Sequence, residues 1–348
     1  MIHEIFHALG LEHPDDNTAF PHDKNSREFT VMAGEFKKEG GAEYIKNNQS
    51  YVVASTAMIY DIAPLQYLYG ANNLYNSGDT IYSYNPNEPF IETIWDGDGN
   101  DTLDLSNFQN KHILNLEDGQ SSTIGFDVNW SMDNNLGIAF NAIIENVKGG
   151  SGADTIKGNK YKNNIQGNAG NDIIDGGTDY DMATYSGNFS DYTFTIADKK
   201  VTVKDNRSST NDGTDTLSNI EKLSFADKNA LITSKEVKGI TSLGFQSEKV
   251  YSGKSDTYKF YDLGSDKYGV ETTSGIDELT STSLLKFDDK NIHLTHDIKG
   301  TFDQVTGLNT DSGEMFRLYN AAFARFPDAD GLKYWIDQFS SGQNTRRV

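Results

Sequence analysis

The chain has 348 residues and carries 30 Lys and Arg against 51 Asp and Glu, which gives a net charge of −21. This negative charge argues against nucleic acid and anionic membrane surfaces as partners, and it favours hard cations such as Ca²⁺, which take oxygen ligands. The sequence contains no cysteine and no apolar run long enough for a membrane span, so a transition metal has to be held by histidine and carboxylate side chains, and we expect no membrane insertion.

Four segments differ in their patterns. Residues 1–72 combine two helical patterns with a polar stretch between them, and residues 73–190 are rich in Gly, Asn and Asp with short apolar pairs, which is typical of short strands and tight turns. Residues 191–311 show the alternation of further strands, as in DYTFTIADKKVTVKD, and residues 312–348 return to a helical pattern. We therefore predict an α+β, multidomain chain with these four segments as its domains.

The first motif in the chain is HEIFHALGLEH, which has the spacing of a metal site. His3 and His7 are four positions apart, so on a helix they share one face and can hold the same ion. Gly10 lets the chain leave the helix, which brings His13 round as a third ligand. Three nitrogen ligands leave a position open for water, as in catalytic zinc sites, and Glu4 is placed to take a proton from that water.

A repeat of nine residues fills the segment 149–184, which reads GGSGADTIK, GNKYKNNIQ, GNAGNDIID and GGTDYDMAT. The glycines allow carbonyl oxygens to converge on an ion, the acidic sixth position adds charge, and the apolar eighth position points into a coil. Because Ca²⁺ takes six to eight oxygens, neighbouring turns have to share ligands. The second unit has Asn163 at the sixth position, so we expect its half-site to be weak. The predicted calcium residues of the repeat are Gly149, Gly150, Gly152, Asp154, Gly167, Gly170, Asp172, Gly176, Asp179 and Asp181.

This repeat resembles the RTX calcium-binding β-roll of proteins exported by type I secretion. The resemblance implies calcium binding, the type I secretion machinery as a partner and an extracellular location. In the same resemblance Asp98 and Asp101 belong to an early calcium-binding turn, for which an ordinary β-turn is the alternative. At the other end of the chain, LYNAAFARFPDADGLKYW resembles the helical DUF4214 module, which we expect to be incomplete here.

The motifs HEIFHALGLEHP, FTVM and APLQYLYGAN precede the repeat in the order found in serralysins, the M10 branch of the metzincin proteases, and the chain resembles that family. The resemblance implies that residues 1–72 are the C-terminal part of a metzincin catalytic domain, with zinc on the three histidines. It implies that residues 73–190 are the RTX β-roll domain and residues 191–311 a β-rich extension. Met32 matches the methionine of the Met-turn beneath the zinc, and Met58 is the competing candidate.

Two function hypotheses follow from this resemblance. The first is a secreted zinc metalloendopeptidase, with Glu4 as general base, protein or peptide as substrate, and calcium as stabiliser of the roll. The second is a non-catalytic extracellular calcium-binding RTX protein with a zinc motif that no longer works. Gly34 motivates the second, because serralysins place a tyrosine there; Tyr44 and Tyr51 are candidates to replace it. We also expect Met1 to be an internal methionine of a longer protease.

Overall fold

The computed structural model describes most of the chain up to residue 299. The described ranges are 2–16, 20–33, 52–209, 211–233, 236–243, 248–265, 267–279 and 284–299. These residues belong to two compact units, of which unit 1 comprises Met1–Asp227 with Ile232–Glu236, and unit 2 comprises Lys228–Leu231 with Val237–Val348. The helical pattern predicted at 312–348 lies outside the described residues.

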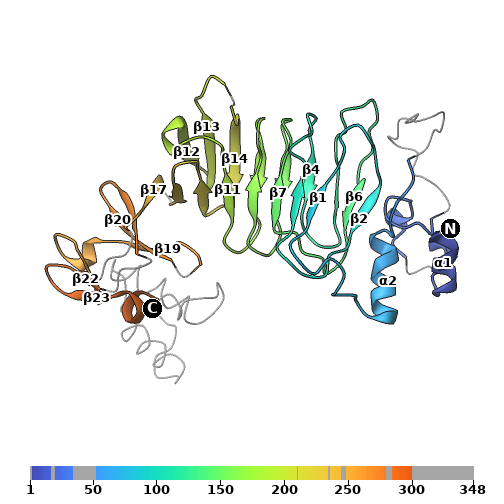
Figure 1. Cartoon of the computed structure of the whole chain (residues 1–348), viewed down its shortest axis with the longest axis horizontal. Coiled ribbons are helices and arrows are strands. Elements are labelled where there is room, and N and C mark those ends of the chain that lie inside the picture. Colours follow the sequence, from blue (N-terminus) through green and yellow to red (C-terminus); the bar gives the residue numbers. More distant parts are fainter. Residues whose placement is uncertain are drawn as a thin grey trace. The chain divides into compact units, whose positions relative to one another are not determined.

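Unit 1 consists of short strands preceded by two helices (Figure 1). Its helices are α1 (Ile2–Ala8) and α2 (Ile59–Tyr69), both within the two helical patterns of the sequence. Its strands are β1 (Ile81–Ser83), β2 (Glu92–Ile94), β3 (Thr102–Asp104), β4 (Ile113–Asn115), β5 (Ser121–Ser122), β6 (Leu136–Ile138), β7 (Asn146–Lys148), β8 (Thr155–Lys157), β9 (Asn164–Gln166), β10 (Ile173–Asp175), β11 (Met182–Thr184), β12 (Tyr192–Ala197), β13 (Lys200–Asp205), β14 (Thr214–Ser218) and β15 (Lys222–Ser224). Single 3₁₀ turns occur at Pro14–Asp16, His22–Lys24 and Phe189–Asp191.

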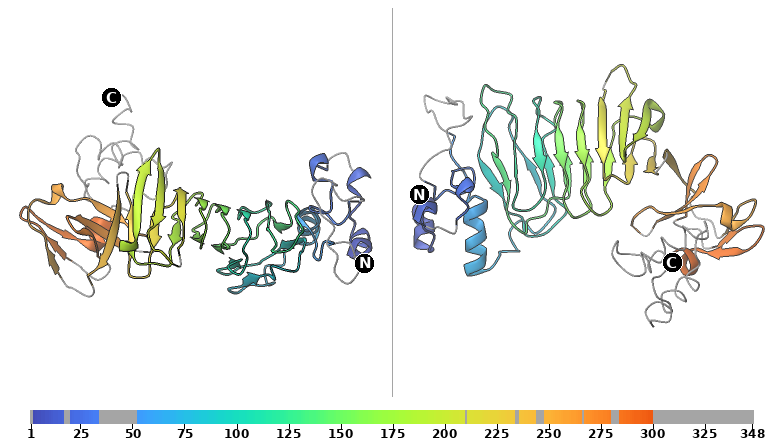
Figure 2. Two further views of the ribbon diagram at one scale, coloured as in Figure 1. Left: turned by 90° about the horizontal axis from the view of Figure 1, so that it is seen from above. Right: turned by 180° about the vertical axis from the view of Figure 1, so that it is seen from behind.

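Most strands of unit 1 form a parallel β-roll. From β7 to β11, successive strands along the chain alternate between two sheets, and the unit 1 strands of these sheets have the orders β1-β3-β7-β9-β11-β15 and β4-β8-β10-β14-β13-β12. Asn146 pairs with Asn164 in one sheet and Thr155 pairs with Ile173 in the other, so one complete coil takes 18 residues, or two nonapeptides. The views from the front and from behind both show these strands stacked side by side (Figures 1 and 2).

The core of the roll is made by the eighth position of each nonapeptide. Ile156, Ile165, Ile174 and Ala183 are all at most 1% exposed, and they continue a row of buried side chains that begins at Leu103. The strands are only three residues long, so each points a single central side chain inward. Burying one such isoleucine stabilises the fold by about 1.5–3 kcal/mol, which is why the apolar residue recurs every nine positions.

An additional layer lies at the N-terminal end of the roll. A small sheet of order β2-β6-β5 contacts the first turn of α2, where Ile59 is buried. Gly137 of β6 makes this contact possible, because a Cβ atom there would lie 2.8 Å from Ile59 Cδ1. This small sheet therefore provides the support on which α2 is fixed.

Unit 2 contains a second set of strands with a core of its own, formed around Tyr251, Val270, Leu285 and Phe287. Its strands are β16 (Asn229–Ile232, at the division between the units), β17 (Val237–Ser242), β18 (Glu248–Val250), β19 (Phe260–Asp262), β20 (Tyr268–Thr272), β21 (Gly275–Glu278), β22 (Leu284–Lys286) and β23 (Asn291–His293). A 3₁₀ turn at Ser255–Thr257 and a π-helical turn at Leu294–Lys299 complete it. Strands β17, β21, β20 and β19 form one sheet in that order, and β18, β22 and β23 form another.

The β-rich character predicted from the sequence is confirmed, while the limits proposed for the four domains stay predictions. Within the described part of the chain no helix is both long and apolar enough to cross a membrane.

Candidate metal centres

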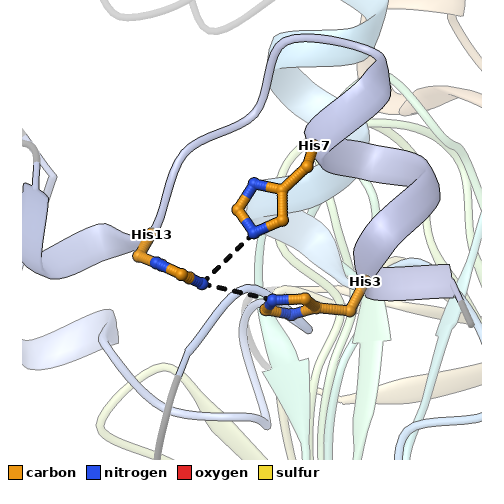
Figure 3. A group of neighbouring side chains, drawn as sticks. All are labelled: His3, His7 and His13. Atoms are coloured by element: carbon orange, nitrogen blue, oxygen red, sulfur yellow. Dashed lines mark hydrogen bonds between the residues drawn. The ribbon is translucent and has the colours of Figure 1, made fainter.

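The three predicted zinc ligands converge at the N-terminal end of unit 1 (Figure 3). His3 and His7 project from the same face of α1, and Gly10, with a φ of +95°, turns the chain so that His13 returns toward them. The Nε2 atom of His13 lies 3.2 Å from Nε2 of His3 and 3.2 Å from Nε2 of His7. One ligand atom from each histidine lies within 4.8 Å of the others.

The backbone fixes which ring nitrogens carry protons. His3 Nδ1 is 2.9 Å from the carbonyl oxygen of Val31, and His7 Nδ1 is 2.8 Å from that of Leu11. A carbonyl oxygen can only accept a hydrogen bond, so both Nδ1 atoms donate. In the neutral rings, each Nε2 atom therefore carries a lone pair and no proton.

The third ring is oriented by a carboxylate rather than by a carbonyl group. Asp16 Oδ2 lies 3.4 Å from His13 Nδ1 and favours the proton on that nitrogen. Three lone pairs therefore face one another at the centre of the cluster, which is unfavourable unless a cation lies between them. Two nitrogens bound tetrahedrally at about 2.0–2.1 Å from one zinc ion are about 3.3 Å apart, so the observed spacing fits zinc.

A buried carboxylate that sequence reasoning missed holds the segment behind His3. Asp61 of α2 is completely buried, and it accepts hydrogen bonds from Thr30 Oγ1 at 2.5 Å and from the Val31 backbone N–H at 2.9 Å. It also caps α2 by accepting the Met58 N–H at 2.8 Å. Burial raises the pKa of Asp61 above its usual value, and these hydrogen bonds offset only part of that rise. Asp61 thus positions the carbonyl group of Val31, which in turn orients His3.

The two methionine candidates occupy different places. Met32 is 1% exposed and belongs to a cluster with Phe6 of α1 and Leu11 of the histidine segment. Met58 is fully buried at the start of α2, where its sulfur accepts a hydrogen bond of 3.7 Å from Thr93 of β2. The packing therefore places Met32, and not Met58, against the histidine segment.

Glu4 lies in α1 between the two histidines and is exposed. Gly34, Tyr44 and Tyr51 lie outside the described residues. The replacement of the expected tyrosine at position 34 by Tyr44 or Tyr51 therefore stays a prediction.

The turns of the roll form two rows, one along each side. Turn row A consists of the turns that lead into β4, β8, β10 and β14, and turn row B of those that lead into β3, β7, β9, β11 and β15. In row A the carboxylates accept the backbone N–H of the preceding coil: His112 N–H donates to Asp154 Oδ1 at 2.6 Å, Asp154 N–H to Asp172 Oδ1 at 2.8 Å, and Asp172 N–H to Asp215 Oδ1 at 2.9 Å.

Row B has the same arrangement. Its first half links Thr80 N–H to Asp101 Oδ1 at 2.8 Å and Asp101 N–H to Glu145 Oε2 at 2.8 Å. Its second half links Asn163 N–H to Asp181 Oδ1 at 2.8 Å and Asp181 N–H to Glu221 Oε2 at 2.8 Å. The rows therefore stack acidic groups from successive coils on top of one another.

One oxygen in each row is left without a hydrogen-bond partner. Asp172 Oδ2 in row A and Asp181 Oδ2 in row B are buried, and neither has a donor among the residues that the structure describes. A buried carboxylate oxygen without a donor is costly unless a cation binds it. These two atoms are the strongest indication of cation binding in the roll.

Glycines surround these oxygens closely. A Cβ on Gly167 would lie 2.1 Å from Asp172 Oδ2, and a Cβ on Gly176 would lie 2.6 Å from Asp181 Oδ2 and 2.1 Å from the Asn219 carbonyl oxygen. Carboxylate and carbonyl oxygens of adjacent coils thus gather in space that no side chain could share. Oxygen ligands of both kinds are what Ca²⁺ requires, so the residues fit this ion.

The electrostatics of the rows agree with this geometry. Burial, followed by the neighbouring carboxylate of Asp215, raises the pKa of Asp172 from 3.8 to about 8. Burial also raises the pKa of Asp181 to about 7, with Glu221 and Asp179 adding to the effect. Asp101 is likewise raised to about 7, mainly by burial. Without a cation, the rows therefore retain protons near neutral pH.

The remaining predicted calcium residues fall into three groups. Asp154 is buried, but both of its oxygens are satisfied, by the backbone N–H groups of His112 and Gly150. Asp98 and Asp179 are exposed, and each accepts the N–H of the residue that follows it. The predicted glycines, which could offer only backbone carbonyl oxygens, all lie in the turns of row A or row B; they are Gly149, Gly150, Gly152, Gly167, Gly170 and Gly176.

Asn163, where the repeat is degenerate, uses its side chain for hydrogen bonds. Its Oδ1 accepts the N–H of Asn159 at 2.8 Å, and its Nδ2 donates to the carbonyl oxygens of Ile144 and Glu145 at 3.3 and 3.1 Å. Its oxygen is therefore not left bare in the way that Asp172 Oδ2 and Asp181 Oδ2 are.

Sequence reasoning missed the acidic groups that continue the rows outside the nonapeptides, namely Glu145, Asp215 and Glu221. The signal that could have found them is position: Glu145 and Glu221 directly precede a short strand, as Asp172 and Asp181 do.

Comparison with known proteins identifies the family to which this architecture belongs. The family described as Peptidase M10 serralysin C terminal matches residues 65–310, which is well over half of the chain. The chain belongs to the serralysin family. A serralysin of Proteus mirabilis is 35% identical over 184 residues, covering 47% of this chain and 35% of the relative. Metalloprotease AprA of Pseudomonas entomophila is 35% identical, covering 47% and 37%, and serralysin C of Dickeya chrysanthemi is 34% identical, covering 45% and 35%.

This serralysin-family chain spans about a third of the length of the curated relatives that it matches. Family membership therefore rests on the roll and the strands that follow it, and the likeness to the DUF4214 module stays a prediction.

Proposed function

We propose that this chain supplies the zinc site of a secreted metalloendopeptidase whose fold is stabilised by calcium. The observation that carries the proposal is the convergence of three Nε2 lone pairs, from His3, His7 and His13, at distances that suit one zinc ion. The protease names of the relatives support a peptide or protein substrate.

In this proposal each residue has a defined part. The three imidazoles would hold zinc, which when bound would act as a Lewis acid toward the peptide carbonyl group and make water more acidic. Glu4, one residue from His3 on α1, takes the proton from the attacking water and passes it to the leaving amine. Asp16 and the carbonyl groups of Val31 and Leu11 keep the rings in the required tautomer. Met32 packs under the histidine segment as the Met-turn methionine.

Calcium has a separate part in the proposal. Asp172 and Asp181 would bind it through their unpartnered oxygens, with carbonyl oxygens from adjacent coils completing the site. Export by the type I machinery and an extracellular location are further parts of the proposal, supported by the resemblance of the repeat to exported proteins, and extracellular calcium at about millimolar concentration would suit such sites.

The test uses the protein that contains this chain and a denatured protein as substrate. Glu4→Gln should reduce kcat by about 10²- to 10⁴-fold and leave the zinc stoichiometry unchanged. Glu12→Gln, which removes an equal charge from an exposed neighbouring position, is the matched control and should keep full activity. Proteolysis that survives in the Glu4 variant would contradict the mechanism.

A second candidate function is a calcium-binding RTX protein without catalysis. Gly34 favours it, since the family resemblance expects a tyrosine at that position. This candidate predicts zinc binding or calcium-dependent folding without any turnover, so the wild-type measurement in the same assay separates the two functions.

A further inference from the structure

Unit 2 contains a second copy of a module of unit 1, with matching sequence in three short segments. YSGNFSDYTF at 185–194 corresponds to YSGKSDTYKF at 251–260, LSFADKN at 223–229 to LKFDDKN at 285–291, and GTDTL at 213–217 to GIDEL at 275–279. Each copy contains an antiparallel three-stranded sheet, β12-β13-β14 in the first and β19-β20-β21 in the second. In each copy the third of these strands and the strand that follows pair in parallel with two earlier strands.

The aromatic cores of the two copies agree in detail. Tyr185 stacks on Phe225 with ring centroids 5.6 Å apart at 18°, and Tyr251 stacks on Phe287 at 5.4 Å and 16°. The next tyrosine of each copy meets the same phenylalanine at 5.0 Å and 50° in the first and 5.1 Å and 58° in the second. Backbone bonds also correspond, as in Tyr185 N–H to the Ser224 carbonyl at 2.8 Å and Tyr251 N–H to that of Lys286 at 2.9 Å.

The two copies differ in the surroundings of one shared aspartate. In the first copy, Asp215 accepts the backbone N–H of Asp172 in row A. Burial raises the pKa of Asp215, and the carboxylates of Asp212 and Asp205 raise it further. Its counterpart in the second copy is Asp277, which is 9% exposed and accepts a hydrogen bond of 3.1 Å from Tyr251.

The register shows what has replaced the acidic neighbours. Asp277 pairs with Thr241, which stands where the first copy has Asp172, and Ser274 stands where it has Asp212. Ala183 of the roll corresponds to Lys249, because these residues pair with Leu223 and Leu285 respectively. The Nζ atom of Lys249 lies 3.8 Å from Asp277 Oδ2.

Other lysines of unit 2 pair with three further carboxylates of its strands. Lys238 lies 3.0 Å from Glu271, Lys267 lies 3.3 Å from Glu278, and Lys286 contacts Glu248 at 2.6 Å. Lys249 therefore supplies an opposite charge at Asp277 itself. In the first copy the cation Arg207 pairs with Asp205 at 2.6 Å and Asp212 at 3.2 Å, and the charged neighbours that raise the pKa of Asp215 are these two carboxylates.

We propose that residues 237–293 are a second copy of the module that ends the β-roll, in which the Lys249 amine replaces a metal ion and the fold is independent of calcium. Its contrast with the first copy rests on the calcium binding proposed above for the roll.

Hydrogen exchange of the whole chain, followed by mass spectrometry in calcium and in EGTA, tests this proposal. Peptides covering β20 and β21 should exchange at the same rate in both conditions, while peptides covering β8 to β11 should exchange at least about tenfold faster in EGTA. Faster exchange in β20 and β21 with the calcium midpoint of the roll would overturn the proposal. If the roll itself ignored calcium, the proposed calcium role would fail, but the independence of unit 2 would hold.

Variants at the shared aspartate and at Lys249 sharpen the test. Asp215→Asn should shift the calcium midpoint of the roll, whereas Asp277→Asn should leave that midpoint unchanged. Lys249→Met should speed exchange in β20 and β21 about tenfold with and without calcium, because it leaves Asp277 without its cation. Lys249→Arg and the double variant Lys249→Met with Asp277→Asn should restore protection. A Lys249→Met protein with unchanged exchange would contradict the role given to the amine.

Discussion

The histidine cluster and the turn rows of the roll both bring bare ligand atoms together, but they do so at different depths. The rings of His3, His7 and His13 lie at a partly exposed surface, and contacts within the protein, from backbone carbonyls and Asp16, orient them. Asp172 and Asp181 are buried, and each lies beside a carboxylate of the next coil, Asp215 and Glu221 respectively, which together with burial raises its pKa. The comparison teaches why the proposed function assigns a chemical part to the metal of the exposed cluster and a structural part to the metal of the buried rows.

The largest expected effect is loss of the roll on removal of calcium. EGTA should remove most of the β-signal in circular dichroism that unit 1 contributes, because binding at 100 times Kd stabilises a fold by about 2.7 kcal/mol per site. A zinc-selective chelator should leave the spectrum unchanged. Equal losses with the two chelators would erase the distinction between the sites.

The pH dependence of the calcium-free chain gives a second, intermediate effect. The folded-state pKa of Asp172 is raised from 3.8 to about 8 and that of Asp181 to about 7. Folded protein therefore binds more protons than unfolded protein, so this stability is complete below the unfolded pKa and is lost as the pH rises toward 8. In buffer freed of calcium, the β-signal of unit 1 in circular dichroism should therefore be larger at pH 5 than at pH 8. Saturating calcium should abolish or reverse the trend, since the metal requires the ionised carboxylates.

The smallest expected effect concerns the orientation of His13. Asp16→Asn should weaken zinc binding by about tenfold, because an outer carboxylate fixes the ring tautomer and raises the basicity of the ligand. Competition with a chromophoric zinc chelator measures the change, with Glu12→Gln as the control for the lost charge. Calcium-dependent folding should be unaffected, and a coupled change in it would show that the two regions are not independent.

The zinc ligands, the parallel coil and the hairpin of residues 191–205 could be anticipated because each leaves a short-range pattern. His3 and His7 share a helix face, Ile156 and Ile174 recur at a fixed period, and the hairpin alternates. Confirmation by comparison extends to the family and the β-rich fold, while the roles of the individual ligands stay predictions.

Other features could not be anticipated, because they depend on contacts between distant segments. Asp61 reads as an ordinary helix residue until the fold brings Thr30 and Val31 against it. Asp215 joins row A only through its parallel pairing with the strand after Asp172. The second copy of the module is hard to find from the sequence because its identities fall in three short segments separated by stretches without similarity.

The 18-residue coil has a consequence for how the gene can change in length. Adding or deleting nine codons in the roll would move every downstream strand to the opposite sheet and exchange the two sides of the molecule. Eighteen codons would leave every later pairing intact and alter only the number of coils. Growth of this region by duplication is therefore restricted to even numbers of nonapeptides.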